Sequence, residues 1–235
     1  MKNVYRAAAT AIALIAATGA AQAEPGKIQV KLMGSGVLPD GEISRIEYVN
    51  SAVFTGPLAV TTAPQTKAND NVVPTLAIEY FVTPNISLET ICCFTQHDVD
   101  FTAGVLGTST NLTGGEAVSN ALILPATLTA KYHLNAGGIK PYVGAGISYF
   151  VFIDEKPGAT VAGLGVDKLR LDDKIGFALQ GGVDVPLNEK MGISLDAKKY
   201  FQDTTAHFFV GNTEVLTTKH KLDPWVLSAG VSYRF

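Results

Sequence analysis

The sequence is short of charge, of cysteine and of long hydrophobic runs. Asp, Glu, Lys and Arg make up 17% of its 235 residues, against about 25% in an ordinary soluble domain. Beyond the N-terminal segment, no stretch approaches the ~20 continuous apolar residues that a membrane-spanning helix needs. The chain is nevertheless 47% hydrophobic. Because lipid accepts only helices and edge-free sheets, this combination favours a closed β-barrel.

The two cysteines, Cys92 and Cys93, are adjacent. Neighbouring residues on a strand point to opposite faces, so a disulfide between them would be strained. A metal or redox centre would need further Cys or His at ligand spacing, which the sequence lacks. We therefore expect two small apolar strand residues, no metal and no cofactor.

The net charge of −3 gives no reason to expect nucleic acid as a partner.

Catalytic motifs are also missing. None of the four histidines, which are His97, His133, His207 and His220, has a G-x-S-x-G or H-E-x-x-H context. The paired carboxylates of Asp172 and Asp173 are typical of a solvated turn. The sequence therefore gives no reason to expect an enzyme.

The chain begins with a targeting segment. Lys2 and Arg6 precede an apolar run over residues 7–19, and residues 21–23 read Ala-Gln-Ala, a small-residue cleavage site. The run is too short to span a bilayer, so it predicts a secretory signal peptide over residues 1–23. We expect the mature domain to cover residues 24–235.

Runs of alternating apolar and polar residues predict eight strands. They cover residues 27–35, 70–82, 86–95, 121–134, 140–153, 173–187, 190–202 and 220–235. The connections alternate between short hairpin turns, at 83–85, 135–138 and 188–189, and long loops, at 36–69, 96–120, 154–172 and 203–219. This pattern indicates an all-β fold: an eight-stranded antiparallel transmembrane β-barrel of a bacterial outer membrane, with short periplasmic turns and long extracellular loops.

The composition of the two strand faces predicts which one meets lipid. In the last strand, Trp225 and Leu227 share one face, and Ser228 and Ser232 share the other. A soluble barrel would carry many Lys and Glu on its polar face, but this face holds mainly Gly, Ser, Ala and Thr. Small side chains suit the inside of a narrow eight-stranded barrel. We therefore expect the apolar face to point outward.

The alternation places ten ionisable side chains in the lumen. They are Lys31, Glu79, Glu89, Lys131, His133, Lys174, Asp184, Asp196, Lys198 and Arg234. Charges in a low-dielectric space must be paired or hydrated. We expect an interior charge network that obstructs the periplasmic half of the lumen. The alternative is that these residues only stabilise the barrel and have no part in transport.

The upper lumen is predicted to be apolar. Phe150 and Phe152 lie toward the long-loop rim of their strand, and Leu124 enters its strand from the same rim. Apolar groups at the channel mouth would favour hydrophobic solutes, although simple packing of the mouth is the alternative. Pro125 cannot donate a ladder hydrogen bond, so it can open a gap in the wall, or it can be an ordinary strand start.

Several segments together resemble the OmpW family of small outer-membrane barrels. The resemblance spans almost the whole mature chain and lies in residues 71–89, 94–98, 124–132, 141–146, 222–226 and 230–235. Cys93 departs from the pattern, since the family usually has proline there. The first long loop, residues 36–69, does not align.

The resemblance implies a narrow hydrophobic channel in the barrel. Small hydrophobic molecules would enter from outside and leave laterally into the membrane through a gap in the wall, for which Pro125 is the matching residue. The expected partners are outer-membrane lipids, small hydrophobic solutes and, through the C-terminal aromatic Phe235, the barrel assembly machinery. The alternative is a structural or adhesive barrel whose extracellular loops bind partners without conduction.

Overall fold

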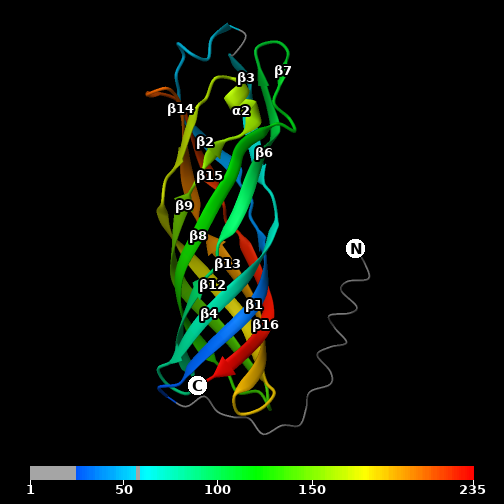
Figure 1. Ribbon diagram of the computed structural model, residues 1–235, viewed down its shortest axis with the longest axis vertical. Helices are drawn as coiled ribbons and strands as arrows, with labels where there is room; N and C mark the ends of the chain where they lie inside the picture. The colour runs from blue at the N-terminus through cyan, green and yellow to red at the C-terminus, as the bar shows by residue number, and fades with distance from the viewer. Residues whose placement is uncertain (1–24, 57–58) are drawn as a thin grey trace, which may run out of the picture.

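A computed structural model describes residues 25–56 and 59–235, and the predicted signal peptide at 1–23 lies outside these residues. Figure 1 shows a tall β-barrel with further strands above its lower part. Eight strands form the barrel wall: β1 (Ile28–Leu38), β4 (Asn71–Phe81), β5 (Ile86–Cys92), β8 (Glu116–His133), β9 (Lys140–Ile153), β12 (Lys174–Pro186), β13 (Met191–Phe201) and β16 (Trp225–Arg234). The predicted eight-stranded antiparallel barrel is therefore confirmed.

The wall closes because each strand pairs with two neighbours. The antiparallel pairs run β1–β4, β4–β5, β5–β8, β8–β9, β9–β12, β12–β13 and β13–β16. The ring is completed between β1 and β16, where Lys31 lies opposite Ser232 and Val37 opposite Val226. A closed ring leaves no unpaired edge in the membrane, which is the condition for a sheet in lipid.

Side chains alternate along these strands as the sequence predicts. In β4, for example, the residues alternate strictly between buried and exposed from Val72 to Phe81. The exposed positions form a belt of large apolar side chains that would meet acyl chains. Its members include Leu32, Ile78, Leu88, Leu128, Ile147, Phe177, Leu195, Leu227 and Val231. Among the described residues, no helix is long and apolar enough to cross a membrane.

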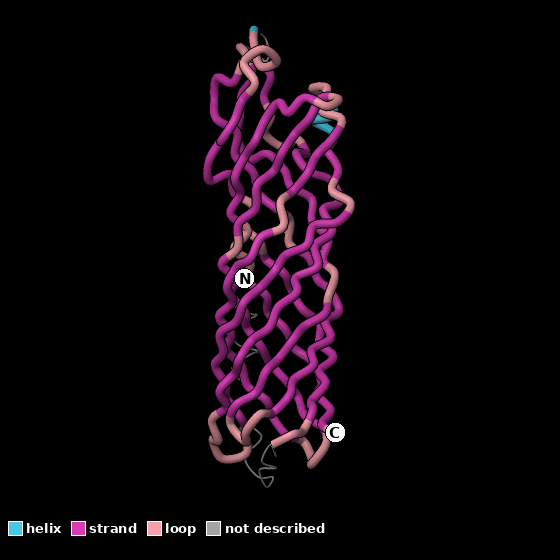
Figure 2. Tube along the Cα trace, turned by 90° about the vertical axis from the view of Figure 1, so that its left-hand side faces the viewer, coloured by secondary structure: helices cyan, strands magenta, loops and turns pink. Residues whose placement is uncertain are grey.

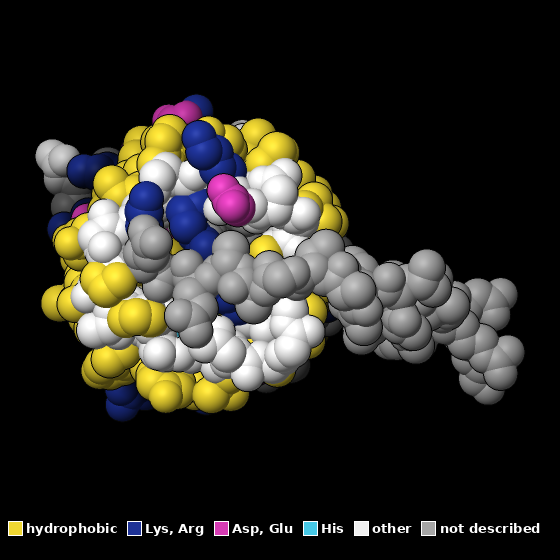
Figure 3. Space-filling view, turned by 90° about the horizontal axis from the view of Figure 1, so that it is seen from below, with side chains coloured by type: hydrophobic (Ala, Val, Ile, Leu, Met, Phe, Trp, Pro, Cys, Tyr) yellow, Lys and Arg dark blue, Asp and Glu magenta, His cyan; other side chains and the backbone are white. Residues whose placement is uncertain are grey.

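The lower end of the barrel is the short-turn end. The turns between β4 and β5, between β8 and β9 and between β12 and β13 span residues 82–85, 134–139 and 187–190. Seen from this end, Lys and Arg side chains gather near the middle of the molecule, and hydrophobic side chains surround them (Figure 3). The C-terminal end of β16 also lies here (Figure 1), which makes this the periplasmic side.

The four long connections are not irregular loops, as the sequence suggested, but mostly strands that lengthen the barrel upward (Figure 2). They comprise β2 (Glu42–Val49), β3 (Val60–Ala68), β6 (Thr95–Leu106), β7 (Thr110–Asn111), β10 (Lys156–Pro157), the short helix α2 (Ala159–Gly163), β11 (Lys168–Leu171), β14 (Asp203–Val210) and β15 (Thr213–Lys221). Strands β3 and β6 join the barrel sheet, while β11, β14, β15 and β2 form a second sheet.

Several strand boundaries also differ from the prediction, two of them most clearly. The strand predicted at 121–134 begins earlier, at Glu116. The strand predicted at 220–235 is divided, because residues 222–224 separate β15 from β16. Asp223 there has a φ of 30° and is followed by Pro224, so the ladder cannot continue through this point.

Candidate functional site in the barrel lumen

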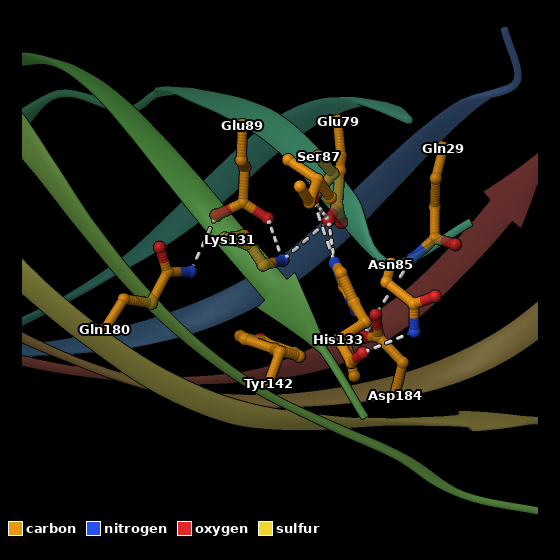
Figure 4. A network of polar contacts seen from close by, with 12 residues as sticks. Gln29, Glu79, Asn85, Ser87, Glu89, Lys131, His133, Tyr142, Gln180 and Asp184 are labelled. Atoms are coloured by element: carbon orange, nitrogen blue, oxygen red, sulfur yellow. Dashed lines mark hydrogen bonds and ion pairs between the residues drawn. The ribbon is translucent and has the colours of Figure 1, made fainter. Parts of the chain in front are cut away.

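The lower lumen holds a compact network of buried ionic side chains (Figure 4). The Nζ atom of Lys31 lies 2.8 Å from Glu79, 3.2 Å from Glu89 and 3.3 Å from Asp184. The Nζ atom of Lys131 lies 3.0 Å from Glu79 and 2.9 Å from Glu89. Each ammonium is therefore shared between carboxylates that are themselves buried, so the charges compensate one another within the lumen.

Uncharged side chains complete this network. The Ser87 hydroxyl donates to Glu79 Oε1 at 2.5 Å, and His133 Nε2 lies 2.8 Å from the same oxygen. The Gln180 amide donates to Glu89 at 2.8 Å and to Asp196 at 2.6 Å, and the Tyr142 hydroxyl donates to Asp196 at 2.7 Å. The alternation along β9 and β12 also puts Tyr142 and Gln180 on the inward face, but a search for charges alone passes over them.

The network fills the lumen because its members come from strands all around the wall. Lys131 Nζ of β8 lies 3.7 Å from the centre of the Tyr142 ring of β9. Lys198 Nζ approaches Glu89 Oε1 at 3.6 Å from β13. Since these side chains are almost entirely buried, the network separates the upper lumen from the periplasmic end.

Two of the ten predicted interior charges lie apart from this network. Lys174 is partly exposed and donates to the Thr205 hydroxyl at 2.7 Å. It lies opposite Phe150 in the ladder, so it is inward-facing but far above the other charges, and its predicted membership is wrong. Arg234 lies at the periplasmic end, where it donates to Gln29 at 2.6 Å.

Above the network lies an apolar cavity. Its wall includes Met33, Ile91, Ile123, Phe150, Phe152, Tyr200, Leu222 and Val226. It is narrow, with about 70 Å³ free for water-sized molecules. Phe150 packs edge-on against the Tyr200 ring, with 5.3 Å between the ring centres. The structure thus places two of the predicted mouth residues, Phe150 and Phe152, in this cavity.

The third predicted mouth residue, Leu124, does not line the cavity. It is half-buried on the outward face of β8, between the buried Ile123 and Pro125. The sequence does not reveal this orientation because residues 122–125 are all apolar, so the two faces of the strand look alike there. Counting back in steps of two from the inward Lys131 gives Pro125 and Ile123 as the lumen residues.

The barrel wall is interrupted beside the cavity. Pairing between β5 and β8 ends at Ile91 opposite Thr127. Pairing between β6 and β8 begins only at Thr95 opposite Ile123. Residues 92–94 and 124–126 lie between these points and do not pair with each other, although residues 124–126 stay paired with β9 on their other side. Pro125, which has no N–H to donate, lies in the middle of this wall break and lines the cavity.

The outer side of the wall break is apolar. Phe94 and Cys92 are exposed there, and Ala126 is exposed on the facing strand. Cys93 is buried and lines the cavity. The two adjacent thiols therefore point to opposite faces, and neither is in a disulfide.

The extracellular end of the cavity is closed by a hydrophobic core, called the extracellular core below. Phe101, Val118, Leu169, Phe208 and Val215 are among its buried members. They come from β6, β8, β11, β14 and β15, so the strands that lengthen the barrel also pack against one another inside it. Because Val118 belongs to this core and also lines the cavity, the core forms the upper boundary of the cavity.

Two histidines that sequence reasoning missed lie at this boundary. His97 Nδ1 lies 2.7 Å from the Asn69 carbonyl oxygen, and His220 Nε2 lies 2.8 Å from the Thr218 hydroxyl. Both rings line the cavity above the apolar belt. Burial lowers the pKa of His97 and lowers the pKa of His220 to about 4. Both rings are therefore neutral at pH 7, as an apolar boundary requires.

Comparison with known proteins gives results that agree with this geometry. The OmpW family model matches residues 24–235. An uncharacterized outer-membrane protein, y4mB, from Sinorhizobium fredii is 37% identical over 171 residues, which cover 71% of this chain and 67% of the relative. Outer membrane protein W from Vibrio cholerae is 29% identical over 179 residues, which cover 75% of this chain and 79% of the relative.

Solved structures show the same fold. OprG from Pseudomonas aeruginosa aligns with a TM-score of 0.71 at 23% identity, covering 92% of this chain and 99% of that one. AlkL, solved in lipid bilayers, aligns with a TM-score of 0.66 at 23% identity and covers 93% of each chain. These two structures share the fold, and the OmpW family model with the outer-membrane relatives places the chain in the bacterial outer membrane, as predicted.

Proposed function

Because the chain belongs to the OmpW family of outer-membrane barrels, we propose that it mediates passive uptake of small hydrophobic molecules, which leave laterally into the membrane. The observation that carries this proposal is the apolar cavity beside the wall break. The cavity is bounded below by the charge network and above by the extracellular core. Its lining includes Cys93 and Pro125 on the two sides of the wall break, so an apolar molecule held there is next to lipid.

The chemistry of the boundaries sets what can pass. Moving an ion through the charge network would cost several kcal/mol in desolvation. Water finds no hydrogen-bond partner at apolar lining residues such as Phe150 and Ile123. A small hydrophobic molecule instead gains about 25 cal/mol for each Å² of its surface that leaves water. The wall break needs no ladder hydrogen bond to be broken, which makes it the favoured exit.

The direct test is uptake of an apolar fluorescent tracer into vesicles whose outer leaflet contains lipopolysaccharide. Phe150 is buried in the cavity, so Phe150→Asp places a charge among apolar walls. We expect this variant to lower the protein-dependent rate by a factor of about 5–30, as a penalty of about 1–2 kcal/mol for a buried polar group implies. Phe150→Leu keeps the wall apolar and should retain most of the rate.

Two results would count against the proposal. One is a wild-type rate no higher than that of vesicles without protein. The other is equal uptake by the wild type and a correctly folded Phe150→Asp variant. Either would favour the alternative, a structural or adhesive barrel whose extracellular strands bind partners without conduction.

The remaining features of the proposal concern how the barrel is made. We propose that residues 1–23 are removed as a signal peptide and that Phe235 is recognised by the barrel assembly machinery. The Phe235 ring is exposed and packs against Tyr233 with 4.9 Å between ring centres, so it is available to a partner. We assign no catalytic role to the lumen.

A further inference from the structure

The floor of the apolar cavity contains an ammonium group that is poorly paired. Lys198 lines the cavity and is 3% exposed. Among the described residues, its one ion-pair partner is Glu89 Oε1 at 3.6 Å, which is beyond ordinary hydrogen-bond length. By contrast, Lys31 and Lys131 each lie within 3.2 Å of two carboxylates.

The carboxylates near Lys198 are already occupied by other donors. Glu89 accepts from Gln180 at 2.8 Å and from Lys131 at 2.9 Å. Asp196 accepts from Tyr142 at 2.7 Å and from Gln180 at 2.6 Å. Lys198 is therefore the cation of the network with the least compensated charge, and its donors border the cavity.

A second polar group at the cavity lining also has an unused donor. Thr75 is buried and lines the cavity, and its hydroxyl has no hydrogen-bond partner in the part of the chain that the structure describes. Cys93, which also lines the cavity, interacts with Thr75 and Lys198. A hydroxyl from β4 and an ammonium from β13 thus face the same cavity.

We propose that Lys198 and Thr75 bind the carboxylate of an amphiphile, such as a fatty acid, whose apolar chain lies in the cavity above them. This inference rests on the proposed function and names a solute class for the same cavity. A carboxylate accepts hydrogen bonds and carries the negative charge that would pair with the Lys198 ammonium. The chain would extend past Ile91 and Phe150 toward the extracellular core, along the apolar lining.

The wall break fits the same class of solute. The alkyl chain of the amphiphile can pass between residues 92–94 and 124–126 into lipid without desolvating a charge. The carboxylate stays at Lys198 during this step and leaves last. An alkane of the same length would fill the apolar part of the cavity but would leave Lys198 and Thr75 without an acceptor. The cavity should therefore discriminate in favour of the acid.

The test compares decanoate, decanol and decane binding to the protein in lipid nanodiscs at pH 8. Carboxyl-¹³C decanoate reports the surroundings of the head group by NMR, and competition measures the other two ligands. We expect Lys198→Met to weaken decanoate binding about tenfold or more, as the loss of a hydrogen bond to a charged group implies, with little effect on decane. Lys199→Met is the control, since Lys199 lies on the next, outward-facing position and bonds to the Asp223 carbonyl.

A second variant protects the test against misfolding. Thr75→Val is nearly the same size and keeps every charge in the network, and it should weaken decanoate binding by a smaller factor than Lys198→Met. If both folded variants bind decanoate as the wild type does, or if the wild type binds decane and decanoate equally, the carboxylate site is refuted.

Uptake of decane without any preference for decanoate would refute this site while leaving the proposed function intact. A lack of uptake of every ligand, with Lys198-dependent decanoate binding, would refute transport and keep the site.

Discussion

Neutralising one carboxylate of the charge network should destabilise the barrel more than any change of charge on its surface. Glu79 is fully buried and lies within 3.0 Å of Lys31, Lys131 and His133. Glu79→Gln keeps the shape but removes the charge that both ammoniums share. Removing one partner of a buried ion pair costs about 3–5 kcal/mol. Because Glu89 still lies beside both lysines, we expect a value near the lower end, about 3 kcal/mol.

The measurement is urea-induced unfolding in lipid vesicles, followed by the change in gel mobility of the unboiled protein. Glu189→Gln is the matched control, because Glu189 is exposed in a periplasmic turn, and it should change stability by no more than about 0.5 kcal/mol. The double variant Glu79→Gln with Lys131→Met should lose less than the sum of its two single variants, since it removes both partners. Equal stabilities of Glu79→Gln and Glu189→Gln would refute the view that the network stabilises the barrel.

Two further predictions follow from the upper lumen and from the wall. Burial lowers the pKa of His220 to about 4, against about 6.5 in an unfolded chain, so its contribution to stability is complete above pH 6.5 and is lost as the pH falls toward 4. The loss should be about 3 kcal/mol, and unfolding curves of His220→Gln should lack this part of the pH dependence. In the wall, Gly146→Ala should cost about 1–3 kcal/mol, because a Cβ there would lie against the Leu128 carbonyl oxygen and 2.8 Å from Thr129 Cα. Gly34→Ala meets nothing within 4 Å and should be nearly neutral, so equal effects of the two in unfolding assays would contradict this reasoning.

The barrel could be predicted from the sequence because lipid imposes a strict rule on each strand. Every second residue must be apolar where acyl chains surround the wall, so the period of two persists along strands such as β4. Above the membrane the rule no longer applies. In β14, for example, Thr204, Thr205 and Ala206 are all buried in succession. The extracellular strands therefore carry no clean alternation, and their turn-rich composition made them look like loops.

The candidate site was predictable only in part, for a related reason. Alternation tells which face of the wall a side chain occupies but not its height in the barrel, so it cannot separate Lys174 from the charges far below it. It also cannot reveal how well a charge is paired. Lys31 and Lys198 are both inward-facing in the sequence, yet their distances to carboxylates differ because these depend on neighbours from distant strands. Of the two histidines at the cavity boundary, His97 lies just beyond the strand predicted at 86–95, and His220 is the first residue of the strand predicted at 220–235.

The relative costs of opening the cavity indicate how its three boundaries must work. Passing downward means separating buried ion pairs, at several kcal/mol for each ion exposed. Passing upward means exposing core side chains such as Phe101 and Phe208, at about 1.5–3 kcal/mol for each large apolar group. Passing sideways at Pro125 breaks no ladder hydrogen bond and exposes apolar atoms to lipid, where they lose little. If the barrel takes up solutes as proposed, we therefore expect exchange between the cavity and the bilayer to be the fast step and movement of the extracellular core to limit the rate of entry from outside.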